Sequence, residues 1–168
     1  MCFYSMCVLV VWLAMPSPET QAQESGASLV ADILDPRARF TLGRAMKAAA
    51  ERLARPECQK VLADFRDPSG HTIQERLDRI GDTPRQYLAR LTFHEALDRR
   101  CQDSARLAFT TVGQREVFIC GAQLWRTYPT DPAHVEALII HEMMHTLGLR
   151  ENPPSSLEIN AGVLKRCW

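Results

Sequence analysis

Apolar side chains recur at helical spacing along residues 29–65, which predicts that this region is helical. The apolar positions share one face of a helix, and charged side chains occupy the rest: Leu42, Ala45, Met46, Ala49 and Leu53. Pro56 suits the first turn of a second, short helix that continues to Phe65. Two more helices are expected, one over residues 73–80 that ends at Gly81, and one that begins at residues 83–86 with a capping sequence.

The pattern changes after Arg106 from helical to strand-like. Residues 107–112 and 116–120 are rich in β-branched and aromatic side chains, and Gly113 lies between them, which predicts a β-hairpin. Residues 91–101 fit a helix and a strand equally well.

The last third of the chain is again helical. Asp131 suits the N-cap of a long helix that has Pro132 in its first turn and runs to about Gly148. Residues 152–154 cannot continue a helix, and Ser155 opens a final short helix that ends near Cys167. The predicted fold class is therefore α+β: a helical N-terminal half, a small antiparallel sheet, and the long helix packed beneath the sheet.

Length and charge narrow the range of functions. The 168 residues are enough for one domain with a real core. With 20 basic and 20 acidic side chains, the net charge is zero, so no basic stripe is available to neutralise phosphates. We therefore expect no nucleic-acid partner, and the composition leaves the oligomeric state open.

The N-terminus has the pattern of an export signal. Residues 6–15 are apolar and uncharged, and prolines and small residues follow up to Ala22. This order is typical of a signal peptide over residues 1–22, which leaves a single domain over residues 23–168. A short membrane-proximal or core helix is the alternative, because no Lys or Arg precedes the apolar run. The run is too short to span a bilayer, so we expect a secreted or periplasmic protein with no stable membrane insertion after cleavage.

Four cysteines remain after the predicted cleavage: Cys58, Cys101, Cys120 and Cys167. In an exported chain they are expected to form two disulfides, for which three pairings exist. We favour Cys58–Cys101 with Cys120–Cys167, because sequential pairing would link the helical half and the hairpin half separately. No close C-x-x-C spacing indicates a zinc cluster or a redox pair.

The sequence His141-Glu142-Met143-Met144-His145 lies within the long predicted helix. Two histidines four residues apart project from one helix face, so both imidazoles can reach a single zinc ion. Glu142 lies beside the ion without being forced to bind it, and can take a proton from water as a general base. The alternative is that both histidines are ordinary side chains satisfied by hydrogen bonds.

This motif resembles that of the zincin metallopeptidases, which are named for H-E-x-x-H. The stretch from His141 to Glu151 is similar to the metzincin pattern H-E-x-x-H-x-x-G-x-x-H, with Gly148 at the glycine where the helix turns toward the third ligand. Position 151 is Glu where metzincins have His, and no methionine follows Met144, so the metzincin Met-turn is absent. The resemblance implies a substrate-binding edge strand above the metal helix, for which residues 116–120 are the candidate; they also read as a simple core strand.

The segment before the motif gives a weaker likeness. Residues 117–124, with Cys120 among them, are similar to the cysteine-bearing segment of deuterolysin-like peptidases, but the G-T-x-x-D motif of that group is absent. The resemblance therefore indicates the broad class only.

The third metal ligand has two candidates. Glu151 follows Gly148 by three residues and has no other local role, whereas Glu158, the position favoured by a gluzincin-like arrangement, belongs to a capping box with Ser155. We therefore expect zinc to be held by His141, His145 and Glu151.

Four other side chains are weaker candidates. His134 could support the site from the same helix face, and Tyr128 could donate to a developing oxyanion, but a surface histidine and a turn tyrosine are the simpler readings. His71 and His94 have no role that the sequence indicates.

The predicted function is an exported zinc metallopeptidase that acts on a peptide or protein. The alternatives are a non-catalytic, disulfide-stabilised zinc module and a hydrolase of a non-peptide amide.

Overall fold

The computed structural model describes residues 32–103 and 105–168. The predicted signal peptide and its cleavage site lie outside these residues. The α+β fold class is confirmed, with a three-stranded sheet and eight α-helices in the described part of the chain. Among the described residues, no helix is long and apolar enough to cross a membrane.

The N-terminal half is helical, as predicted. Helix α1 (Pro36–Leu53) buries the predicted apolar face, and the short helices α2 (Pro56–Gln59) and α3 (Val61–Asp64) follow it. Helix α4 (Ile73–Ile80) ends at Gly81, which has a φ of 79°, and α5 (Pro84–Ala89) begins at a complete capping box.

The sheet contains the predicted hairpin and one additional strand. Strands β2 (Ala108–Thr110) and β3 (Glu116–Ile119) pair antiparallel, whereas β1 (Thr92–Glu95) pairs with β3 in parallel. The sheet is therefore mixed, not antiparallel as expected, because part of the ambiguous segment 91–101 became a strand on the far side of β3. A short 3₁₀ helix, η1 (Arg99–Gln102), ends that segment.

The strand order β1-β3-β2 corrects a second expectation. Residues 116–120 were the candidate for a substrate-binding edge strand, but β3 is the central strand, and both of its edges are already paired. The strand next to the helix of residues 132–146 is β2, whose one pairing partner in the described part of the chain is β3.

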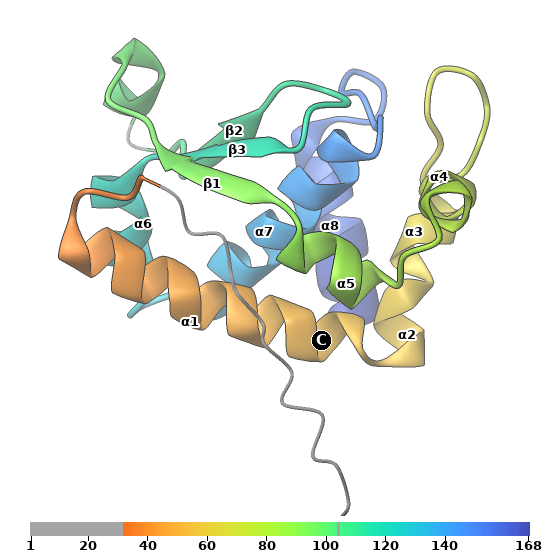
Figure 1. Cartoon of the computed structure of the whole chain (residues 1–168), viewed down its shortest axis with the longest axis horizontal. Coiled ribbons are helices and arrows are strands. Elements are labelled where there is room, and N and C mark those ends of the chain that lie inside the picture. The colour runs from red at the N-terminus through yellow and green to blue at the C-terminus, as the bar shows by residue number, and fades with distance from the viewer. Residues whose placement is uncertain (1–31, 104) are drawn as a thin grey trace, which may run out of the picture.

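Helix α7 (Pro132–Thr146) lies between the sheet and α1 (Figure 1). It packs against α1 on one side and β2 on another, and α8 (Ser156–Cys167) packs against α7. Helix α6 (Gly121–Thr127) connects β3 to α7. Residues 135–146 of α7 are all buried, so this helix forms the centre of the molecule.

Two disulfides are present, as expected, but their pairing was predicted wrongly. The bonds are Cys58–Cys167 and Cys101–Cys120, with Cα–Cα distances of 4.3 and 5.2 Å. Helix α8 returns to pack against α2 and α3, which brings the C-terminus to the helical half of the chain. Sequential pairing could not anticipate this return, because it depends on tertiary packing.

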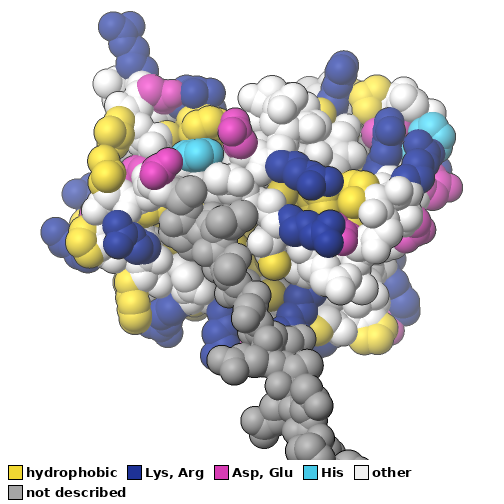
Figure 2. Space-filling view, in the orientation of Figure 1, with side chains coloured by type: hydrophobic (Ala, Val, Ile, Leu, Met, Phe, Trp, Pro, Cys, Tyr) yellow, Lys and Arg dark blue, Asp and Glu magenta, His cyan; other side chains and the backbone are white. Residues whose placement is uncertain are grey.

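The surface is mixed in charge. On the face drawn in Figure 2, basic, acidic and apolar side chains are interspersed.

Candidate metal centre

Local signals fix both ends of α7. The Asp131 side chain accepts a hydrogen bond from the His134 N–H at its start. At its end the N–H of Gly148 donates to His145 O, and the N–H of Leu149 donates to Met144 O. These two bonds define a Schellman motif, and Gly148 has the positive φ, 108°, that such an ending requires. The chain therefore reverses directly after the second histidine of the motif.

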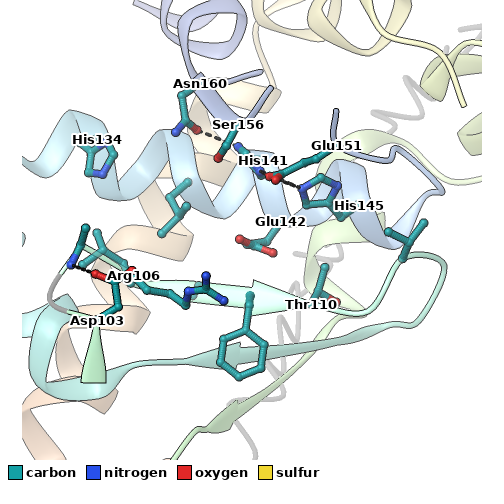
Figure 3. Close-up of a pocket in the computed structure, with 16 residues that line it drawn as sticks. Asp103, Arg106, Thr110, His134, His141, Glu142, His145, Glu151, Ser156 and Asn160 are labelled. Carbon is teal, nitrogen blue, oxygen red and sulfur yellow. Dashed lines mark hydrogen bonds and ion pairs between the residues drawn. The ribbon is translucent and has the colours of Figure 1, made fainter. Parts of the chain in front are cut away.

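This reversal brings three side chains of the motif together. His141 Nε2 and His145 Nε2 are 2.8 Å apart, and each is 3.3 Å from Glu151 Oε1. Figure 3 shows the Glu151 carboxylate pointing toward both rings. The histidines are buried, whereas the Glu151 side chain is 37% exposed. The group predicted from the sequence is thus assembled, and it can hold a metal ion.

The outer nitrogens of both rings fix the tautomers. His141 Nδ1 lies 2.8 Å from Asn160 Oδ1, and His145 Nδ1 lies 2.7 Å from the carbonyl oxygen of Leu149. Both oxygens accept, so we assign the ring proton to Nδ1 in each case. Both Nε2 atoms then carry bare lone pairs.

Three electron-pair donors therefore face one another without a proton between them. Burial, and next the neighbouring His145 ring, lower the pKa of His141, which favours its neutral form. Such a cluster is repulsive on its own and is stabilised by a cation at its centre. Two ligands of a tetrahedral zinc ion are about 3.3 Å apart when each bond is 2.0–2.1 Å long. The two histidine–Glu151 distances agree with this value, whereas the two histidine nitrogens, at 2.8 Å, are closer together and would have to separate to bind the ion.

Glu142 lies next to this cluster but takes no part in it. Its Oε2 is buried and has no hydrogen-bond partner among the described residues. Burial, and next the charge of Glu151, raise the pKa of Glu142 to about 8. A carboxylate that is desolvated and unpaired in this way is typical of a proton-transfer group.

A cavity of about 510 Å³ opens over Glu142 and the three clustered side chains. Helix α7 forms one wall, and β2 with the preceding loop forms the other (Figure 3). The hairpin is attached to the helix end, because the N–H of Gly113 donates to His145 O over 3.0 Å. The walls therefore hold a fixed relation to the candidate ligands.

Glu158 is separate from the site. Its Oε2 accepts hydrogen bonds from the N–H and the hydroxyl of Ser155, both at 2.7 Å, so it completes the capping box of α8 as predicted. These bonds lower its pKa.

Of the four weaker candidates, one lines the cavity and the other three lie elsewhere. His134 lines the cavity two turns before His141. The Tyr128 hydroxyl instead donates to Glu136, outside the cavity. His71 lies beside Asp67, and His94 lies on the outer face of the sheet against Phe118.

Sequence reasoning missed three elements of the site: Asn160, the carbonyl of Leu149, and Arg106 in the cavity wall. Leu149 follows Gly148 directly, so the Schellman ending could have indicated its carbonyl. Asn160 and Arg106 reach the site through the packing of α8 and of the loop before β2, for which the sequence holds no local signal.

Comparison with models of protein families, with curated proteins and with solved structures found no match.

Proposed function

We propose that the chain is a zinc-dependent hydrolase that cleaves peptide bonds. The observation that carries the proposal is the meeting of His141, His145 and Glu151 beside the buried, unpaired carboxylate of Glu142, in a cavity that is open to solvent. A structural zinc site is usually closed by four protein ligands, whereas a catalytic one has three and keeps a position open. The three ligands here fit the second type.

The ligand chemistry favours zinc. Two imidazoles and one carboxylate match the donors that zinc accepts in catalytic sites. The hydrogen bonds from Nδ1 to Asn160 and to the Leu149 carbonyl orient both rings and make them better ligands. When bound, a zinc ion supplies a Lewis acid that polarises a carbonyl group and lowers the pKa of water.

Glu142 is assigned the proton transfers. Its Oε2 takes a proton from the attacking water, and the same atom later delivers that proton to the leaving amine. Burial holds the carboxylate in place and removes competing hydrogen bonds. Glu142 needs no direct contact with the ion for this role.

The cavity walls support a peptide as substrate. Among the described residues, strand β2 pairs with β3 alone, and its residues line the cavity. An extended peptide can therefore form backbone hydrogen bonds with β2 while its scissile carbonyl lies at the ligand cluster. We therefore propose residues 108–110, in place of 116–120, as the substrate-binding strand.

The two disulfides support export. Such bonds persist in oxidising compartments, which agrees with the predicted signal peptide and with a secreted or periplasmic location.

The test is metal analysis combined with a cleavage assay on the full chain, folded with its disulfides intact. We expect about one zinc per chain, cleavage of unstructured protein or peptide, loss of cleavage with a chelator, and recovery with zinc. A chain that binds zinc but cleaves nothing would support the non-catalytic zinc module. A chain that releases amines only from cell-wall polymer would support the alternative of a hydrolase that acts on a non-peptide amide.

A further inference from the structure

Arg106 is the one Arg or Lys among the described residues that line the cavity. It lies on the wall opposite the histidines, and Figure 3 shows its side chain extending along the cavity toward Glu142. The proposed function gives Arg106 no role so far.

No carboxylate in the described part of the chain forms an ion pair with Arg106. The nearest acidic residue in sequence, Asp103, uses Oδ1 to accept the Ala105 N–H over 3.0 Å. By contrast, Arg100 forms an ion pair with Asp98 and stacks on Phe109. Arg106 is therefore an exposed guanidinium at the cavity, and the described residues do not use its hydrogen-bonding capacity.

The backbone around Arg106 is well anchored. The Cys101–Cys120 disulfide joins Cys101 to the residue that follows β3, and the Cys120 N–H donates to Leu107 O, directly after Arg106, over 2.9 Å. The Arg106 N–H itself donates to Asp103 O over 3.1 Å. The guanidinium thus projects from a positioned segment attached to β3.

Arg106 adds one positive charge to a cavity lined by three carboxylates, those of Asp103, Glu142 and Glu151. Zinc would contribute two further positive charges, so the cavity charges balance when all three carboxylates are ionised. Because no described carboxylate forms an ion pair with Arg106, its guanidinium can still pair directly with a carboxylate of a bound molecule. A planar guanidinium binds a carboxylate through two parallel hydrogen bonds, which is the strongest pairing open to it.

We infer that Arg106 binds a carboxylate of the substrate, so that the site selects peptides with a carboxylate close to the scissile bond. This inference rests on the proposed function and specifies its substrate class. The carboxylate can be the C-terminus of the peptide or an Asp or Glu side chain, and the chemistry of recognition is the same for both.

The activity test uses matched peptide pairs with the zinc-loaded full chain. One pair differs in a C-terminal carboxylate or amide, and the other pairs have Glu or Gln at single positions around the cleaved bond. We expect kcat/KM to be about 10- to 100-fold higher for the acidic member of at least one pair, as fits a charged hydrogen bond. Arg106→Gln should abolish this preference, Arg106→Lys should restore part of it, and the control Arg99→Gln should leave it unchanged.

A binding test separates this inference from the proposed function. Two zinc-loaded proteins are compared by calorimetric titration: Glu142→Gln alone, and Glu142→Gln combined with Arg106→Gln. Each is titrated with two pairs of N-terminally blocked tetrapeptides. One pair differs in a C-terminal acid or amide, and the other differs in a Glu or Gln side chain. We expect preferential binding of an acidic form only when Arg106 is present. The pair that shows the preference identifies the source of the carboxylate.

The outcomes are distinct. Cleavage by the wild type without any acid preference would overturn the Arg106 inference and leave the hydrolase proposal standing. Arg106-dependent binding in a protein that cleaves nothing would support the Arg106 inference and contradict the hydrolase proposal. An acid preference that persists in Arg106→Gln would also overturn the inference, because the carboxylate would then contact the metal and not Arg106. An equal loss of activity on every peptide in Arg106→Gln would overturn it as well, because Arg106 would then act on the reaction itself.

Discussion

Helix α7 contains two buried glutamates, one of which has polar partners for its carboxylate while the other has an oxygen without one in the described part of the chain. Glu136 and Glu142 are almost equally inaccessible, at 5% and 4% exposure. Glu136 lies 2.8 Å from Arg52 Nε on α1 and also accepts from the Tyr128 hydroxyl. Glu142 has an Oε2 without a partner among the described residues, and its pKa is raised.

The difference separates a structural half of the helix from a candidate functional half. The two residues are six positions apart, so they point to different sides of α7. Glu136 faces α1, and its charge is compensated within the core. Glu142 faces the cavity, where an unpaired carboxylate costs stability and gains nothing from packing. Folding alone does not account for Glu142, whereas the proposed proton transfer would.

The largest effect is expected on zinc affinity when a ligand is removed. His145→Ala and Glu151→Ala should each weaken zinc binding by more than about 100-fold, because each removes one of three metal ligands. Substitutions of residues that only orient a ligand weaken metal binding by at most roughly 100-fold. Competition titration with a zinc chelator measures this. The Glu136 ion pair should persist in both variants. Tight zinc binding in Glu151→Ala together with loss in Glu158→Ala would transfer the third ligand to α8.

A smaller effect is expected from Asn160→Ala. Loss of the 2.8 Å contact to His141 Nδ1 frees the ring to rotate and to change tautomer, so zinc affinity should fall about 10- to 100-fold. The same titration measures it, with Lys165→Ala, an exposed position on α8, as the control. Equal affinities in the two variants would mean that α8 does not orient the ligand.

The stability of the metal-free protein should separate the two glutamates directly. Glu136→Gln leaves Arg52 without its buried charge partner and should lower the free energy of unfolding by about 1–3 kcal/mol, a range that allows for the 25% exposure of Arg52. Glu142→Gln replaces a desolvated carboxyl group, which its raised pKa leaves largely uncharged at neutral pH, with a neutral amide of similar size, and should not lower the free energy of unfolding. Denaturant unfolding with chelator present measures both, and a similar loss in the two variants would remove the distinction.

The smallest effect is expected outside α7. Glu158→Ala breaks the capping box of α8 and should lower the free energy of unfolding by about 0.5–2 kcal/mol. Its zinc affinity should match that of the wild type, because Glu158 bonds only to Ser155. A fall in zinc affinity with unchanged stability would be the opposite of this expectation.

Local sequence signals predicted the parts of this molecule that depend on near neighbours. Asp131 and Gly148 delimited α7 to within two residues, and the β2–β3 hairpin and the Ser155 capping box were found where expected. Glu151 could be predicted beside the histidines because Gly148 reverses the chain only three residues earlier.

The parts that sequence reasoning missed depend on contacts distant in sequence. The strand at residues 92–95 is defined by its parallel pairing with β3. The disulfide pairing follows from the return of α8 to α2, with a sequence separation of 109 for Cys58–Cys167. Asn160 and Arg106 reach the cavity in the same way, by the packing of separate segments, so spacing along the chain could not identify them.

The central claim is that Glu142 performs chemistry while Glu136 maintains structure. The most direct test compares zinc-loaded Glu142→Gln and Glu136→Gln in one peptide-cleavage assay, with zinc content and folding measured on the same samples. We predict that Glu142→Gln retains its zinc and loses about 100- to 10,000-fold in kcat, while folded Glu136→Gln cleaves at close to the wild-type rate. Wild-type cleavage by Glu142→Gln, or an equal loss in both folded variants, would contradict the account.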